Sequence, residues 1–321
     1  MNKRLRIVFM GTPEFAVASL DALVKSSHPV VAVVTVPDKP ANRGLKLQAS
    51  AVKEYAVTHN LKILQPEKLK DESFITELKS LEPDLQVVVA FRMLPEVVWK
   101  LPRYGTINLH ASLLPQYRGA APINRAIING EKETGITTFF IRREIDTGDI
   151  LMQERIPISE TDDAGTIHDK LMIAGAKLVV KTVDAIVAHT ITPLKQEKFS
   201  QSDLKPAPKI FRESCCINWF EPAGEVYNFI RGLSPYPGAW TEFINTAKQK
   251  TLIKIFKTRR QNTIQSPAGK AIIANTNKLY IGCKDEALEI LELQPEGRKR
   301  MTTQEFLRGI RDENKAWDTT F

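Results

Sequence analysis

An amide, an imidazole and a carboxylate are the side chains of this sequence whose types and spacing best suit chemistry. Asn108 and His110 lie two residues apart in the segment 105–110, and residues two apart on a strand point to the same face. Asp146 lies in a second segment, 144–150, between two apolar runs. A carboxylate near His110 would fix the tautomer of the ring and favour its charged form. Three such groups around one acyl carbon would suit acyl transfer without a covalent intermediate.

Structural roles for the same residues remain open at this point. A single His is more often structural than functional, and Asp146 stands in an Asp-x-Gly pattern that favours tight turns. A covalent nucleophile has little support, because the Gly-x-Ser-x-Gly elbow is missing and Cys215 and Cys216 lie in or near a linker-like stretch. The other histidines have no metal-ligand spacing and are interpreted as structural or surface residues: His28, His59, His168 and His189.

The first half of the chain alternates short Val- and Ile-rich runs with helical patterns, which predicts an α/β domain with a Rossmann-like, mainly parallel sheet. Strands are expected at 5–10, 30–36, 85–90, 105–110, 135–141 and 150–156. Helices are expected at 14–26, 49–59, 72–81 and 164–188. Thr12 is predicted to cap the first helix with Pro13 at its first position, and Thr161 or Asp162 to cap the last. Only Gly11 lies in the first turn, so the dinucleotide fingerprint is absent, as is a P-loop.

The second half is organised differently. Residues 190–209 are rich in Pro, Lys, Gln and Ser, which is typical of a linker. A helical pattern at 226–233 follows, and then short strand-like runs at 239–244, 251–257, 271–275, 278–283 and 288–293, which predict a small OB-like β-barrel. We therefore expect a catalytic domain at 1–189, a linker at 190–209 and a barrel domain at 210–321. Trp219 and Trp240 could stack on bases, although the barrel core is the favoured interpretation.

Composition narrows the class of protein. The net charge is +8, and residues 206–321 carry 18 basic against 13 acidic side chains. A basic smaller domain points weakly to a polyanionic partner, although a Lys-rich solvated surface is by itself the favoured explanation of the excess. Three cysteines without ladder or cluster spacing point to a reducing compartment, and no stretch approaches the length of a membrane span. We expect a cytoplasmic protein and, by default, a monomer.

Three motifs together resemble the folate-dependent formyltransferases. They are Phe9-x-Gly11-Thr12-Pro13-x-Phe15, then Asn108-x-His110-x-Ser112-Leu113-Leu114-Pro115-x-x-Arg118-Gly119-x-x-Pro122, and Asp146-Thr147-Gly148-Asp149. The resemblance covers nearly the whole chain. The loop at 37–44 and the C-terminal segments 217–219 and 231–240 are similar to members that act on aminoacyl-tRNA. The family usually has Gly after the aromatic residue and one further residue before Leu-Pro, where this chain has Phe91-Arg92-Met93-Leu94-Pro95.

The resemblance implies transfer of the formyl group of 10-formyltetrahydrofolate to the amine of methionine on initiator tRNA, without a metal. Asn108 and protonated His110 would stabilise the oxyanion, and Asp146 would hold His110 charged and help relay protons. Folate contacts would come from two segments: Ser112, Leu113, Leu114 and Pro115, and Phe91, Arg92 and Met93. Contacts to the acceptor end of the tRNA would come from Lys39, Arg43 and Lys46, and the basic C-terminal domain would lie along the acceptor arm.

Three other functions are compatible with parts of the sequence. A formyltransferase for a small amine, such as a nucleotide-linked amino sugar, would share the catalytic residues but would not need a basic loop. A catalytically silent RNA-binding protein is disfavoured by the intact Asn108, His110 and Asp146. Hydrolysis of formyl-folate is chemically close, and it predicts formate release without an amine acceptor.

Overall fold

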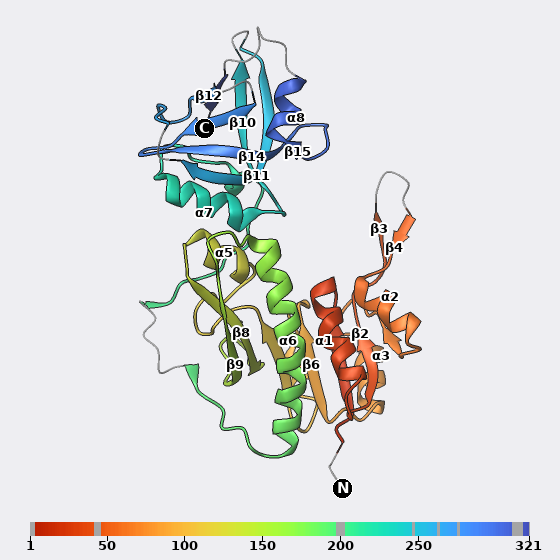
Figure 1. Cartoon of the computed structure of the whole chain (residues 1–321). Helices are drawn as coiled ribbons and strands as arrows, with labels where there is room; N and C mark the ends of the chain where they lie inside the picture. Colours follow the sequence, from red (N-terminus) through yellow and green to blue (C-terminus); the bar gives the residue numbers. More distant parts are fainter. Residues whose placement is uncertain are drawn as a thin grey trace. The chain divides into compact units, whose positions relative to one another are not determined.

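Runs of branched apolar residues form the strands of the first sheet, because such side chains can be buried on both faces between layers of helices. A computed structural model describes residues 4–41, 46–196, 203–245, 248–261, 264–274, 277–309 and 317–320. The described parts of 1–119, 134–156 and 168–206 form one compact unit, and those of 120–133, 157–167 and 207–321 form a second. Figure 1 shows the course of the chain through both.

The first sheet has seven strands in the order β5-β2-β1-β6-β7-β8-β9. Its strands are β1 (Ile7–Gly11), β2 (Val30–Val34), β5 (Ile63–Leu64), β6 (Leu85–Val89), β7 (Thr106–His110), β8 (Glu133–Phe140) and β9 (Ile150–Pro157). The first five of these strands in chain order pair in parallel, and β8 pairs antiparallel with β7. The mainly parallel α/β sheet that the sequence predicts is therefore confirmed.

Helices cover the faces of this sheet. Val8 and Met10 of β1 belong to the same buried cluster as Phe74 and Leu78 of α3 (Glu72–Ser80) and Val98 of α4 (Glu96–Trp99). The long helix α6 (Ala164–Val187) approaches β7 and β8 closely. A Cβ on its Gly175 would lie 2.7 Å from Leu109 and 2.6 Å from Ile136. Because side chains alternate along β7, Asn108 and His110 lie on the face opposite to Leu109. The remaining helices of this unit are α1 (Glu14–Val24) and α2 (Ala51–Thr58).

The second sheet is antiparallel and has the order β12-β13-β14-β11-β10-β16, with β15 beside β14. Its strands are β10 (Ala239–Asn245), β11 (Lys250–Gln261), β12 (Ala271–Ala274), β13 (Lys278–Gly282), β14 (Ala287–Pro295), β15 (Met301–Thr302) and β16 (Trp317–Thr320). The Thr319 N–H donates to the Gly269 carbonyl at 2.9 Å, which brings β16 to the residues just before β12. The curved sheet closes in this way, and the predicted small barrel is confirmed.

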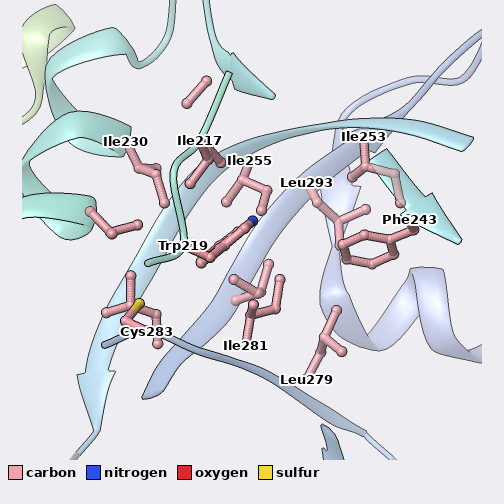
Figure 2. Packing of buried hydrophobic residues seen from close by; sticks show 14 of the residues in the cluster. Ile217, Trp219, Ile230, Phe243, Ile253, Ile255, Leu279, Ile281, Cys283 and Leu293 are labelled. Carbon is pink, nitrogen blue, oxygen red and sulfur yellow. The ribbon is translucent and has the colours of Figure 1, made fainter. Parts of the chain in front are cut away.

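Trp219 is the largest fully buried side chain of the barrel unit. It is 1% exposed and packs in one apolar cluster with Ile217, Ile230, Phe243 and Ile255, as Figure 2 shows. Its indole Nε1 donates to Thr241 Oγ1 at 3.1 Å, so the one polar atom of the ring also has a partner. The cluster includes residues of α7 (Ala223–Leu233). The interpretation of Trp219 as a core residue is confirmed.

Two predicted helix caps are wrong. Pro13, not Thr12, is the N-cap of α1, and no side chain caps that helix. At the start of α6, Asp163 Oδ1 accepts from the Thr166 N–H at 2.8 Å, whereas the Asp162 carboxylate accepts from the Ser159 N–H at 2.7 Å. The predictions placed each cap one residue or more too early. At α6, several neighbouring Thr and Asp residues can all cap, and only the helix's first turn selects among them. At α1, the helix begins after Pro13 without a capping side chain.

Several short elements were not predicted. They are β3 (Lys39–Ala41), β4 (Lys46–Gln48), α5 (Pro122–Ile128), a 3₁₀ turn at Glu213–Cys215 and α8 (Thr303–Arg308), together with β5, α4, β15 and β16. The sequence did carry a signal for α8, since Thr302 and Glu305 form a capping box. Among the described helices, none combines the length and the apolar composition that a membrane crossing requires.

Candidate active site

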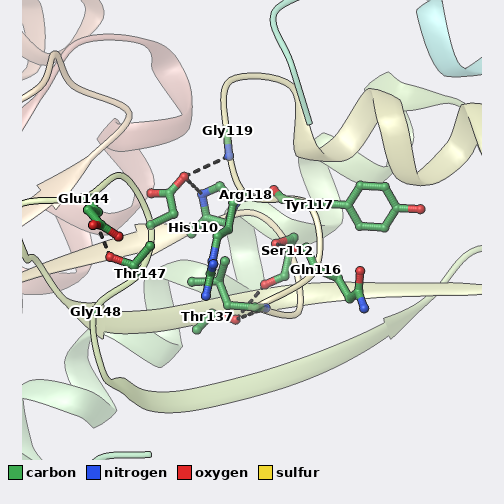
Figure 3. A network of polar contacts seen from close by, with 12 residues as sticks. His110, Ser112, Gln116, Tyr117, Arg118, Gly119, Thr137, Glu144, Thr147 and Gly148 are labelled. Atoms are coloured by element: carbon green, nitrogen blue, oxygen red, sulfur yellow. Dashed lines mark hydrogen bonds and ion pairs between the residues drawn. The ribbon is translucent and has the colours of Figure 1, made fainter. Parts of the chain in front are cut away.

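His110 ends the central strand β7 and stands at the carboxyl edge of the parallel strands, where open α/β sheets place their sites. The residue is 7% exposed. Its Nε2 lies 2.9 Å from the Tyr117 carbonyl oxygen (Figure 3). Because a carbonyl oxygen only accepts, Nε2 carries a hydrogen and donates it. The neutral ring therefore has its lone pair at Nδ1.

Asp146 faces that second nitrogen. Its Oδ2 lies 3.7 Å from His110 Nδ1, and the side chains of Asp146 and His110 are only 12% and 7% exposed. The separation is longer than a hydrogen bond, but water screens the interaction little at this burial. Asp146 is thus the carboxylate that faces His110 Nδ1. The structure brings together these two residues, which are distant in sequence.

The turn that carries Asp146 is held from several sides. The Gly119 N–H donates to Asp146 Oδ2 at 2.9 Å. Asp146 has a φ of 55°, a left-handed conformation that Asp adopts more readily than most residues. Gly148 admits no side chain, because a Cβ there would lie 1.6 Å from the Phe140 carbonyl oxygen. The Asp-x-Gly pattern thus reflects a tight turn, and that turn presents Asp146 to His110.

Asn108 lies one pleat behind His110 on the same face and is half-buried. Its main chain pairs with Val88 and Phe139 in the sheet. Its side-chain amide makes no hydrogen bond within the described part of the chain. An amide in this position can donate to a substrate oxygen without first giving up a protein partner.

The turn after His110, residues 112–115, is fixed by hydrogen bonds within the turn and from neighbouring strands. Ser112 is fully buried and its hydroxyl donates to the Gln116 carbonyl at 2.6 Å. Thr137 Oγ1 donates to the Ser112 carbonyl at 2.6 Å and accepts from the Leu114 N–H at 3.2 Å. Gln153 Nε2 donates to the Leu114 carbonyl at 2.9 Å. The Ser112 hydroxyl therefore serves the turn itself.

The segment after β6 contains the other predicted folate contacts. The Arg92 guanidinium donates to the Glu67 carbonyl at 2.7 Å and to the Pro66 carbonyl, and burial lowers its pKa. It also lies 5.5 Å from the centre of the Phe91 ring. Met93, in contrast, is 70% exposed. Arg92 thus fastens this segment to its own chain, and Met93 is the member of the set that extends into solvent.

Other histidines have contacts that fit structural or surface roles. His28 is 4% exposed, accepts from the Leu5 N–H at 3.1 Å and lies 3.0 Å from Asp184. His168 is partly exposed beside Asp169. In the part of the chain that the structure describes, no three His, Cys, Asp or Glu side chains are arranged to hold a metal ion.

Comparison with known proteins decides the family. The formyl transferase profile matches residues 5–183, and the profile of the formyl transferase C-terminal domain matches residues 209–311. The chain belongs to the formyl transferase family. The resemblance seen in the motifs is therefore confirmed.

Curated relatives of this formyl transferase extend over the whole chain. The methionyl-tRNA formyltransferase of Bacteroides thetaiotaomicron is 54% identical over 309 residues, which are 96% of both chains. That of Flavobacterium johnsoniae is 48% identical over 315 residues, covering 98% of this chain and 99% of its own.

Solved structures support the fold. One is WlaRD, a sugar 3N-formyl transferase crystallised with dTDP and 5-N-formyl-THF, with a TM-score of 0.63 and 21% identity over 92% of this chain and 100% of its own. Another is HypX from Aquifex aeolicus in complex with tetrahydrofolic acid, with a TM-score of 0.64 and 18% identity over 99% of this chain and 51% of its own. At these identities the likeness concerns the fold alone.

The structure describes only some of the residues that are predicted to contact tRNA. Lys39 is exposed at the start of β3, Arg43 lies outside the described residues, and the side chain of Lys46 does too. The base of the loop is fixed by Asp38, whose carboxylate accepts from Lys53 at 2.5 Å and Gln65 at 2.9 Å. These hydrogen bonds, first that from Lys53, lower the pKa of Asp38.

Sequence reasoning missed the residues that support the catalytic groups. Thr137 and Gln153 lie under the 112–115 turn, and Gln196 contacts the Asp146 turn. Gln196 comes from the Pro-, Lys- and Gln-rich stretch that was interpreted as a linker, and no motif distinguishes it there. Thr137 has no local signal either, because it stands beside His110 only through the antiparallel pairing of β7 with β8.

Proposed function

We propose that the chain transfers the formyl group of 10-formyltetrahydrofolate to the free amino group of methionyl-initiator tRNA, giving N-formylmethionyl-tRNA for translation initiation. The observation that carries the acceptor is the near full-length identity to curated methionyl-tRNA formyltransferases. The paired His110 and Asp146 beside the Asn108 amide support the chemistry. The reaction belongs in the cytoplasm, where translation starts.

The reaction requires a developing negative charge to be stabilised. The methionyl amine attacks the formyl carbon, a new C–N bond forms, and the formyl oxygen becomes an oxyanion. The bond from the carbon to the folate nitrogen then breaks, and the proton lost by the amine ends on that nitrogen. Asn108 donates to the oxyanion, a contribution whose loss typically costs about 10²–10³ in rate.

His110 acts together with Asp146. Its Nε2–H is engaged by the Tyr117 carbonyl at 2.9 Å, so its positive charge, stabilised by Asp146, acts on the oxyanion from the pocket wall. Direct donation from Nε2 would require the Tyr117 contact to lengthen as substrate binds, which is common when catalytic hydrogen bonds form. Proton relay passes from the amine to the leaving nitrogen through Asp146 and water.

Substrate contacts follow from the same arrangement. Folate binds against the 112–115 turn and the 91–93 segment: Ser112 and Arg92 are turned inward and offer main-chain groups, whereas Leu113 and Met93 offer apolar side chains. Lys39, Arg43 and Lys46 contact the acceptor end of the tRNA. The catalytic domain at 1–189, linker at 190–209 and tRNA-binding barrel domain at 210–321 remain the proposed functional division.

The test is formyl transfer from 10-formyltetrahydrofolate to purified Met-tRNA, with initiator and elongator species compared in one assay. Formylation of the initiator alone supports both reaction and acceptor. Absence of transfer to either species, with folate turned over by another amine or by water, would instead support the small-amine or hydrolase alternative.

Arg43→Ala tests the acceptor assignment separately. We expect a higher KM for tRNA and a weaker dependence of that KM on salt, because each lost phosphate contact removes about one unit of the logarithmic salt slope. Folate binding should be unchanged. Lys79→Ala, at an exposed residue in the last turn of α3 and outside the proposed tRNA contacts, is the matched control. A wild-type salt dependence for Arg43→Ala would contradict the loop assignment.

A further inference from the structure

Gln196 lies outside every motif that pointed to the function, yet its side chain is buried against the Asp146 turn. The residue is 3% exposed. It lies two residues after Leu194. The N–H and carbonyl of Leu194 exchange hydrogen bonds of 2.8 and 2.9 Å with Ile150, the first residue of β9. This main-chain pairing brings Gln196 from the stretch after α6 to the carboxyl edge of the sheet.

Both the nitrogen and the oxygen of the Gln196 side-chain amide make hydrogen bonds. Nε2 donates to the Asp146 carbonyl at 3.0 Å and to the Gly148 carbonyl at 2.6 Å. Oε1 accepts from Arg118 Nε at 3.1 Å and from an Arg118 terminal nitrogen at 2.7 Å. A buried amide whose donors and acceptor are all satisfied holds its partners in one arrangement.

The contact to the turn restrains Asp146 itself. Asp146 is in the left-handed region, with a φ of 55°, which is a strained conformation for a residue with a side chain. Gln196 fixes its carbonyl and the Gly119 N–H fixes its carboxylate. With both ends of the residue held, the carboxylate stays turned toward His110 Nδ1.

The contact to Arg118 has a second consequence. Burial lowers the pKa of Arg118, while the nearby charges of Asp146 and Glu144 act to raise it, so the guanidinium lies within the field of the catalytic carboxylate. A free guanidinium there would favour a bidentate pair with Asp146. Because Gln196 accepts two of its N–H groups, Arg118 is held in another direction and the carboxylate remains available to His110.

We propose that Gln196 is a positioning residue of the active site, which holds the Asp146 turn and Arg118 so that the Asp146 carboxylate faces His110. The inference rests on the proposed function, because it assigns Asp146 and His110 to formyl transfer. It adds a role for the stretch after α6, which reaches the catalytic pair through this side chain.

Two substitutions separate the contacts. Gln196→Met keeps the length of the side chain and removes every hydrogen bond. Gln196→Glu keeps an acceptor for Arg118 but loses both donors to the carbonyls. We expect each to lower kcat by about 10- to 100-fold, as small displacements of reacting groups do, with KM for folate and tRNA close to wild type.

Gln294→Met is the matched control, since this glutamine of β14 also donates to a carbonyl, that of Arg298, at 2.7 Å. Folate titration gives the fraction of intact sites in each preparation. Wild-type kcat in both Gln196 variants would overturn the proposal. So would a loss of activity that equals the loss of folate-binding sites, since that result indicates a purely structural role.

Failure of the proposed function would give a different result from failure of the positioning role. It would appear as wild-type protein that forms no formylmethionyl-tRNA. In that event the same variants are compared on the amine or water reaction that the wild type does catalyse, where an unchanged kcat still overturns the positioning role.

Discussion

The Asp146 carboxylate is largely shielded from solvent and the barrel core is fully buried, but different forces hold them. In the turn, main-chain and amide groups restrain a single carboxylate through hydrogen bonds from Gly119 and Gln196. In the barrel, Trp219 and the apolar residues around it are held by close packing. Hydrogen bonds contribute little net stability each but fix direction, whereas apolar burial contributes stability with little directionality. A catalytic turn therefore needs hydrogen bonds to fix its direction, and a folded barrel needs apolar burial for its stability.

Substitution in the barrel core should have the largest effect on stability. We expect Trp219→Ala to lower the free energy of unfolding by about 3–5 kcal/mol, because it removes a fully buried ring and leaves a cavity. Urea unfolding monitored by circular dichroism measures this change. Trp240→Phe, at a half-buried indole, is the control and should cost much less. A loss for Trp219→Ala no larger than that of the control would remove the contrast between the two regions.

Substitution of the catalytic groups should produce the opposite pattern. Asn108→Ala should lower kcat by about 10²–10³, with tRNA KM nearly unchanged and stability altered by less than in Trp219→Ala. We expect His110→Ala and Asp146→Ala to reduce turnover severely as well. Steady-state kinetics and urea unfolding of the same preparations separate the two effects. His168→Ala, at a partly exposed ring in the same unit, is the control. Near-normal turnover of His110→Ala would refute the mechanism.

Loss of a half-buried hydrogen bond in the unit that contains the catalytic groups should have the smallest effect on stability. Tyr55 donates to Asp21 at 2.9 Å, and burial, followed by this hydrogen bond and the Asp21 charge, raises its pKa to about 12 from 10.0. Folding thus favours the neutral phenol. Its contribution to stability is fully present below pH 10 and is lost as pH rises through about 12.

Tyr55→Phe tests that contribution. The tyrosinate absorbance of the wild type should include late-titrating groups, since burial also raises the pKa of Tyr227. One of these groups should be missing from the variant. Stability should fall less steeply in the variant above pH 10. Tyr236→Phe, at a residue that is 81% exposed, is the control. A late absorbance change of equal size in Tyr55→Phe and the wild type would show that Tyr55 is not among the late-titrating groups.

Regular elements could be predicted well, because their signals are local. The period of apolar residues placed β1, β7 and α6 to within a few residues, and the five short strands after 238 indicated the barrel. Short elements such as α5 and β5 escaped, since a few residues carry too little periodicity to stand out. The cap of α6 was misplaced because several candidates adjoin one another there, whereas α1 has no side-chain cap that a local signal could identify.

The sequence by itself determined that Asn108 and His110 share one face of a strand, because alternation depends only on neighbouring residues. It also determined the family, through motifs that span the chain. Only the tertiary structure decided that Asp146 stands 3.7 Å from His110 Nδ1 and that Gln196 holds its turn. These contacts depend on the order of strands in the sheet and on the course of loops between them, and distant residues fix both.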